Sequence, residues 1–208
     1  MPVLLANGGP VIWLILFAAA VAIAIFIERV LHCHRAQINS IEFLNGVRNV
    51  LKRDNVVEAI SICDATPSPV ARLVKTAILN RDHGRERVRE AVEEAGLTEV
   101  PALEERLNLL ATIGQIAPLL GLLGTIIGFI RTFTRLQSDG LYARVTGPGS
   151  LAGGIWEALI CAATGIAVAI IVHAGYNYLV NRINKIILDM ERAAGEIVNI
   201  VTENGGGK

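Results

Sequence analysis

The sequence is poor in charge. Asp, Glu, Lys and Arg make up only 18% of its 208 residues, whereas 52% are hydrophobic, and the mean hydropathy is +0.50. This composition is typical of a membrane protein and argues against an ordinary soluble core. The 19 basic and 19 acidic residues cancel, so no polyanionic partner such as a nucleic acid is expected.

Cysteine is also scarce, with three residues in the chain. Cys33 and Cys63 fall in a segment assigned below to the reducing cytoplasm, and Cys161 lies in an apolar run, so we expect no disulfide. In the cytoplasm the first two should react with membrane-permeant thiol reagents. His32 and His34 flank Cys33, but adjacent helical residues point in different directions and no second ligand pair exists, so no metal site is predicted.

Three long runs carry no formal charge, and each is long enough to cross a bilayer, which takes roughly 20 predominantly apolar residues. We see no strand pattern, and no nucleophile and base share a plausible site, so an enzyme is not expected. The fold class predicted is all-α, a polytopic membrane protein with three transmembrane helices that extend into a cytoplasmic helical bundle. The predicted organisation is N-terminus 1–10, first span 11–27, cytoplasmic helical domain 28–106, second span 107–131, loop 132–154, third span 155–181, and C-terminal helix and tail 182–208.

Basic residues set the orientation. No Lys or Arg precedes Arg29, which also argues for a retained helix over a secretory signal. Twelve basic residues lie in residues 28–106 and four follow Asn181, against three in residues 131–154. The positive-inside rule therefore places the middle segment and the C-terminus in the cytoplasm, and the N-terminus and the loop 132–154 outside.

Helical periodicity continues outside the spans. The first span is expected to run on as one long helix to Leu51. The segments NVVEAISIC and PVARLVKTAILN should form a helical hairpin, because the prolines between them disfavour helix. A charged helix from Arg85 should end at Gly96, and a new helix should open at Pro101.

The third helix should be unbroken from Trp156 to Thr202. Beyond the bilayer it carries an apolar stripe at intervals of three or four residues: Ile183, Ile187, Met190, Ala194, Ile197 and Val201. Such a stripe outside lipid needs partners, so we expect a homo-oligomer.

The second span has a face of small and weakly polar residues spaced four, three, four, three, four. These residues are Gly114, Pro118, Gly121, Thr125, Gly128 and Thr132. Two interpretations stay open. The face can line a pore, or it can only pack helices, as Gly124 and Gly128 in a GxxxG pair do.

On the third span Glu157, Cys161 and Thr164 share one face. An ionisable group near membrane depth usually faces a bundle interior or water, although Glu157 can also sit simply at the outer interface. Thr125 lies six residues inside Arg131, and Thr164 lies seven residues beyond Glu157. Antiparallel helices would then bring both hydroxyls to about one level, roughly 9 to 11 Å from the outer edge.

Two segments carry a family resemblance: APLLGLLGTIIGFIRTF from Ala117, and EALICAATGIAVAI from Glu157, followed by Tyr176-Asn177. Weaker similarity extends over IERVL, VVEAISIC and the helical hairpin. The chain resembles the MotA/TolQ/ExbB proton-channel family. Three spans and a length near 200 residues are closer to the ExbB/TolQ branch than to flagellar MotA.

The resemblance implies a homopentamer in the bacterial inner membrane, with the N-terminus periplasmic and the C-terminus cytoplasmic. Its pore would hold a dimeric, single-span ExbD- or TolR-like partner that supplies a proton-carrying Asp. Proton flow would drive a TonB- or TolA-like protein that spans the periplasm. No cofactor is implied, and protons are the coupling ion.

The resemblance also implies pore-lining roles. Thr125 and Glu157 match motif positions of the family. Relatives often have Thr at the position of Ala162, and Thr164 is the candidate to replace it. The remaining candidates on the stripe of the second span are Gly121, Gly128 and Pro118. A proline usual near the inner end of the third span is missing, with His173 in that neighbourhood.

Other functions stay open from the residues alone. In a non-conducting membrane scaffold the glycines would only pack helices and Glu157 would only orient the third span. A flagellar-type stator subunit is a further alternative, and sodium could replace protons. A secondary transporter is disfavoured, because the sequence has no inverted repeat and no pair of broken helices beyond Pro118.

Overall fold

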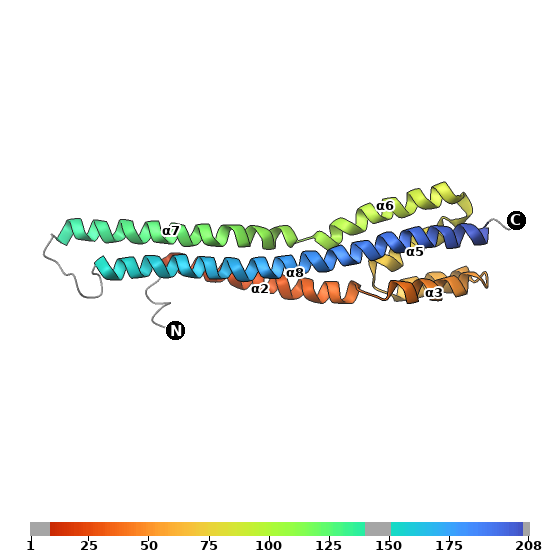
Figure 1. Cartoon of the computed structure of the whole chain (residues 1–208), viewed down its shortest axis with the longest axis horizontal. Helices are drawn as coiled ribbons and strands as arrows, with labels where there is room; N and C mark the ends of the chain where they lie inside the picture. The colour runs from red at the N-terminus through yellow and green to blue at the C-terminus, as the bar shows by residue number, and fades with distance from the viewer. Residues whose placement is uncertain (1–8, 140–150, 206–208) are drawn as a thin grey trace. The chain divides into compact units, whose positions relative to one another are not determined.

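The computed structural model describes residues 9–139 and 151–205. The predicted N-terminus 1–10, loop 132–154 and tail lie partly outside these ranges. The helices are α2 (Gly9–Ala36), α3 (Ser40–Leu51), α4 (Val56–Ala65), α5 (Pro69–Leu79), the short 3-10 helix η1 (Arg81–His83), α6 (Arg85–Glu104), α7 (Leu107–Asp139) and α8 (Leu151–Gly205) (Figure 1). The described residues contain no strand, and three stretches are long and apolar enough to cross a membrane. The all-α prediction with three spans is confirmed.

The chain divides into two compact units. We call Met1–Ile27 with Arg106–Tyr178 the span unit, and Glu28–Glu105 with Leu179–Lys208 the bundle unit. The span unit holds the three uncharged runs. The bundle unit holds the shorter helices and the last part of α8.

The first helix ends at Ala36, so the predicted continuous helix to Leu51 is wrong. Asn39 caps a new helix, α3. Its side-chain oxygen accepts a hydrogen bond from the backbone N–H of Glu42 at 3.4 Å, and its amide donates to the Glu42 carboxylate at 3.3 Å. This N-cap satisfies the backbone N–H of Glu42, one of the first N–H groups of α3 that have no partner within the helix, and so favours a helix start at this point.

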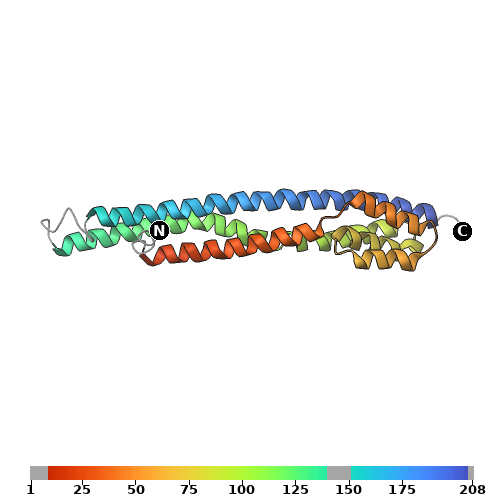
Figure 2. The ribbon, with the colours of Figure 1, turned by 90° about the horizontal axis from the view of Figure 1, so that it is seen from below.

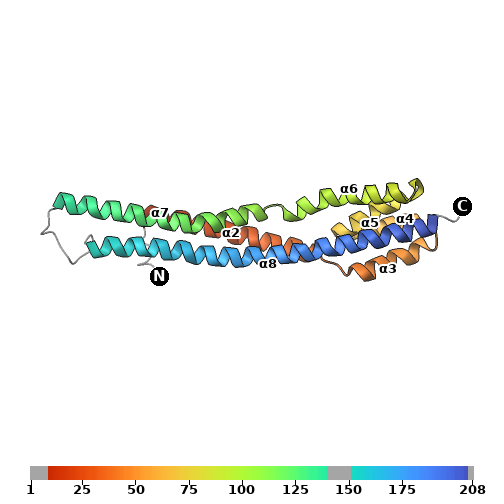
Figure 3. The same ribbon diagram turned by 45° about the horizontal axis from the view of Figure 1, so that its top comes forward.

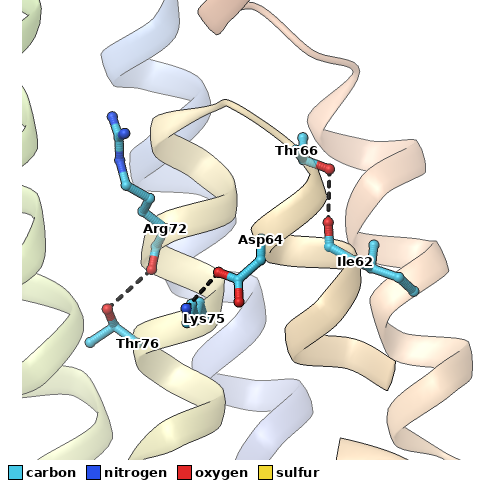
Figure 4. Close-up of polar contacts among 6 residues, drawn as sticks. All are labelled: Ile62, Asp64, Thr66, Arg72, Lys75 and Thr76. Carbon is cyan, nitrogen blue, oxygen red and sulfur yellow. Dashed lines mark hydrogen bonds and ion pairs between the residues drawn. The ribbon is translucent and has the colours of Figure 1, made fainter. Parts of the chain in front are cut away.

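The predicted helical hairpin is confirmed as α4 and α5. Pro69 opens α5 at a position where a missing N–H costs nothing. Figure 4 shows the polar contacts at the turn: the Asp64 carboxylate pairs with the Lys75 ammonium, and the Thr66 hydroxyl donates to the Ile62 carbonyl at 2.9 Å. Of these contacts, only the Asp64–Lys75 pair joins the two helices, and buried apolar residues such as Ala59 and Cys63 of α4 and Val74 of α5 form the packed part of the hairpin.

Helix α6 passes through Gly96 and Pro101, so the predicted break at Gly96 is wrong. A helical glycine costs only about 1 kcal/mol relative to alanine, and packing outweighs it. Arg72 of α5 pairs with Glu99 at 2.6 Å, and Leu103 is buried. The helix ends instead before Arg106, whose φ of 66° is one of two positive non-glycine values among the described residues.

Helix α8 is continuous over 55 residues, as predicted, and about 80 Å long at 1.5 Å per residue. In the bundle unit, Figure 3 labels α3 to α6 beside its last part. Its apolar stripe is packed within the same chain, because Ile183, Met190, Ile197 and Val201 are buried. The expectation that this stripe needs a second copy is therefore wrong.

Candidate functional site at the contact of α7 and α8

Within the span unit, α7 and α8 run antiparallel and touch through their backbones (Figure 1). A Cβ built on Gly165 of α8 would lie 2.7 Å from the carbonyl oxygen of Ala117 and 2.9 Å from the Cα of Gly121. A Cβ on Gly121 would lie 3.0 Å from the carbonyl oxygen of Cys161. Side chains larger than hydrogen do not fit here, so these glycines permit the close approach.

The glycine contacts also fix the register of the two helices. The Gly128 site faces Ala158 at 3.1 Å, and the Gly114 site faces His173 at 3.2 Å. Residues later in α7 therefore face residues earlier in α8, as antiparallel helices require. This register sets Thr125 level with Cys161 and Ala162, and Thr164 lies about 3 to 5 Å deeper. The predicted common level of the two hydroxyls is wrong by two to three residues.

Helix α2 packs on one side of this contact, as Figure 2 shows for the span unit. The Phe26 ring comes within 3.0 Å of the Gly175 site, and Val11 within 3.4 Å of the Gly124 site. A cavity of about 220 Å³ lies between the three helices, lined by Ala22, Ile23, Phe26, Leu110, Ile171, Val172 and Gly175.

The polar face predicted on the third span belongs to this same side. The spacing that joins Glu157, Cys161 and Thr164 continues through Val168, Ile171 and Gly175. The last two line the cavity beside α2. Thr164 therefore does not share a helix face with Ala162, the position it was expected to replace.

The opposite side of the contact carries a different set of residues. Around α7, the contact residues Gly121 and Gly128 separate Gly124 from Thr125, so Thr125 lies away from α2. On α8 the residues on the same side begin at Ala162 and continue at spacings of four, three and four with Ile166, Ala169 and His173. We call this surface the far flank, defined by Pro118, Thr125, Ala162, Ile166 and His173.

The threonine hydroxyls are bonded to the backbone. Thr125 donates to the carbonyl of Leu122 at 2.6 Å, and Thr164 donates to the carbonyl of Ile160 at 2.7 Å. Thr residues in membrane helices commonly bond in this way. A hydroxyl that donates a hydrogen bond to the backbone still has lone pairs that can accept a hydrogen bond. Thr125 is therefore ready to accept a hydrogen bond from a protonated carboxyl.

The predicted stripe of α7 thus divides by position. Gly121 and Gly128 are buried against α8, whereas Pro118 and Thr125 are half-buried. Burial of the two glycines supports the packing interpretation for them. Glu157 is half-buried near the N-terminal end of α8. Its pore-lining role stays a prediction.

Two residues of this site were not singled out by spacing. Among the described glycines of the span unit, Gly165 has the shortest distance from its Cβ position to a backbone atom. His173 packs against Gly114 on the far flank. Gly165 follows Gly121 in no sequence pattern, since only the antiparallel register pairs them. Within the described residues, no three His, Cys, Asp or Glu side chains gather as a metal site would require.

Three apolar helices, two of them packed backbone to backbone, define a polytopic all-α membrane protein. Residues 65–192 match the MotA/TolQ/ExbB proton channel family. The chain belongs to this family and is closest in character to its ExbB/TolQ-like branch.

Curated relatives agree with this assignment. The chain is 30% identical over 182 residues to a putative biopolymer transport protein ExbB homolog of Methanothermobacter thermautotrophicus, covering 86% of this chain and 62% of the relative. It thus spans less than two thirds of that protein. Biopolymer transport protein ExbB of Neisseria gonorrhoeae is 27% identical over 210 residues, covering 92% of each chain. Tol-Pal system protein TolQ of Haemophilus influenzae is 34% identical over 110 residues, covering 53% of this chain and 46% of the relative.

Proposed function

We propose that the chain is the pore-lining scaffold subunit of a motor complex driven by the proton motive force. The far flank carries this proposal, because it places the Thr125 hydroxyl on a surface of α7 and α8 that α2 does not cover. Membership of a proton channel family supports it. The chain acts by conducting and by transmitting force, with protons as the coupling ion and with no enzymatic activity or cofactor.

A partner must supply the proton-carrying group. Apart from Glu28 and Glu157 at their borders, the three spans contain no Asp or Glu. A carboxylate crossing the membrane with its proton must therefore come from another chain. The partner proposed is an ExbD/TolR-like single-span dimer seated against the far flank, and its carboxyl would meet Thr125.

The assembly proposed is a homopentamer in the bacterial inner membrane, with the N-terminus periplasmic and the C-terminus cytoplasmic. The homo-oligomer rests on the family and no longer on the apolar stripe of α8, which its own chain covers. Force would pass to a TonB/TolA-like protein that spans the periplasm. At a membrane potential of about 150 mV one proton carries roughly 3.5 kcal/mol, so substantial work requires several protons.

Reconstitution tests the proposal against a non-conducting scaffold. The chain is placed in liposomes with and without a single-span partner that bears an intramembrane Asp, and proton uptake is measured under an inside-negative potential. Uptake that needs both chains supports the proposal. Sodium uptake is measured in the same liposomes. Co-assembly with uptake of neither ion would leave only the scaffold, and sodium uptake without proton uptake would identify sodium as the coupling ion.

A further inference from the structure

His173 lies deep within the third span. It follows Glu157 by sixteen residues and precedes Arg182 by nine, which corresponds to about 24 Å and 13 Å along a helix. The hydrocarbon layer is about 30 Å thick, so the imidazole lies inside it, in the half nearer the cytoplasm. No other histidine occurs in the three spans. An ionisable group at such depth is costly and usually functional.

Helix α7 makes room for this side chain. A Cβ on Gly114 would lie 3.2 Å from both Cε1 and Nε2 of His173. The edge of the imidazole ring therefore rests against the backbone of Gly114, at the contact between the two helices. A Cβ at position 114 would crowd the ring, which would have to shift by a few tenths of an ångström.

His173 and Thr125 lie on the same flank at different depths. His173 follows Ala162 by eleven residues on the far flank, and Gly114, which it contacts, precedes Thr125 by eleven on α7. The two side chains are thus about 16 Å apart along the membrane normal. A proton that leaves the level of Thr125 toward the cytoplasm passes His173.

Few titratable groups surround the imidazole. On α8, Tyr176 follows one turn later. The residues of α7 at this depth carry no charge, and their polar members are Thr112 and Gln115. Helix α2 packs on the other flank. No charged side chain of the spans therefore competes with His173 for a proton at this level.

Resting on the proposed function, we propose that His173 is a proton-exchanging site in the inner half of the path. A ring nitrogen accepts a proton from hydrated protons in the pore, so one water O–H bond breaks and one N–H bond forms. The imidazolium then releases a proton to water on the cytoplasmic side and returns to the neutral ring. An imidazole has two ring nitrogens, so it can take up a proton at one nitrogen and release a proton from the other.

The test is chemical rescue. His173→Ala should lower partner-dependent proton uptake in liposomes at least tenfold, and adding free imidazole should restore at least half of it, because the substitution opens a space beside Gly114. His173→Asn should lose uptake equally, since the amide fills the site without exchanging protons. Tyr178→Phe is the matched control on the α2 side, where Tyr178 packs on Phe26 with ring centroids 6.4 Å apart. It should conduct as wild type does and not respond to imidazole.

Native mass spectrometry of each complex establishes that the variants assemble, and liposomes without protein give the proton leak that imidazole itself causes. Full uptake by His173→Ala or His173→Asn overturns the inference, and so does uptake that imidazole fails to restore. In those cases the wild-type complex still conducts and the proposed function stands. A wild-type complex that does not conduct removes the proposed function, and this inference with it.

Discussion

Gly165 lies directly against the main chain of Ala117, with a Cβ on Gly165 placed 2.7 Å from that carbonyl oxygen. The carbonyl oxygen of Ala117 and the Cα of Gly121, the two nearest atoms, belong to the backbone, so no rotamer change relieves the overlap. We expect Gly165→Ala to separate α7 and α8 and to cost about 1–3 kcal/mol, the usual cost of overpacking. Thermal unfolding of the detergent-solubilised protein measures the loss.

Gly96→Ala is the matched control. Gly96 is helical in α6 and has nothing within 4 Å of its Cβ position. Alanine there should gain up to about 1 kcal/mol from helix propensity. Equal unfolding temperatures for the two variants would show that the backbone contact of α7 and α8 is not tight.

Arg29 and Glu105 form an ion pair at 3.3 Å between the end of α2 and the residue after α6. The Arg29 side chain is only 5% exposed, so neutralising its partner leaves a poorly compensated buried charge. A double-mutant cycle with Arg29→Met and Glu105→Gln should give a coupling of about 0.5–3 kcal/mol.

The Arg87–Glu90 pair on α6 provides a comparison at nearly the same separation, 3.2 Å. Both side chains are more than half exposed, so solvent screens them and the coupling should be much smaller. If the exposed pair couples as strongly as Arg29 with Glu105, burial is not the source of the effect.

Cys63 should be unreactive in the folded protein. The pKa of its thiol is raised from 9.0 to about 11, mainly by burial and further by the Asp64 carboxylate, while the Lys75 ammonium opposes the rise. At neutral pH about 100-fold less thiolate is then present than for an ordinary thiol, and the thiolate is the reactive form. Ser61→Cys on the same helix is exposed and should react fast, which an aromatic disulfide reagent measures.

The raised pKa of the Cys63 thiol also makes the stability of the folded protein depend on pH at high pH. The folded pKa is raised, so the neutral thiol contributes stability that is complete below pH 9 and is lost as the pH rises through about 11. Cys63→Ala should remove this pH dependence, which is measured as the free energy of unfolding against pH.

Fast labelling of native Cys63 at neutral pH would contradict the burial. Cys33 is buried as well, so neither native cysteine reports topology as the sequence suggested.

The family resemblance predicts that Glu157→Gln reduces partner-dependent proton uptake while the complex still assembles, whereas the spacing of Glu157 with Cys161 and Thr164 puts it on the α2 side of α8 and predicts no effect on a path along the far flank. Glu191→Gln, on the exposed surface of the same helix in the bundle unit, is the control and should conduct normally. Wild-type uptake by Glu157→Gln would leave Glu157 a residue of the outer interface.

Sequence periodicity predicts the helices better than it predicts their ends and contacts. The unbroken α8 follows from its apolar repeat. The break after Ala36 does not follow from periodicity, and its signal is the N-cap residue Asn39 with Glu42 three residues later. Gly96 alone predicts a helix end, but tertiary packing of α6 outweighs its small propensity cost.

The candidate site was predicted in part for the same reason. Spacing places Thr125 and Gly121 on one face of α7, but it does not say which of them faces α8. The antiparallel register decides this, and it depends on Gly165, which lies 44 residues after Gly121. Spacing likewise shows that Thr164 and Ala162 lie on different sides of α8, but only the position of α2 shows which of the two sides is covered.

On the far flank, the Thr125 hydroxyl is the group proposed to meet the proton. Thr125→Val keeps the shape and removes the hydroxyl, whereas Thr125→Ser keeps the hydroxyl and removes a methyl group. The decisive measurement is partner-dependent proton uptake in liposomes by both variants, with oligomer integrity measured beside it. We expect the Thr125→Ser complex to conduct and the Thr125→Val complex not to conduct, with both complexes intact. An intact Val complex that conducts as wild type does would contradict this expectation and make Thr125 a packing residue.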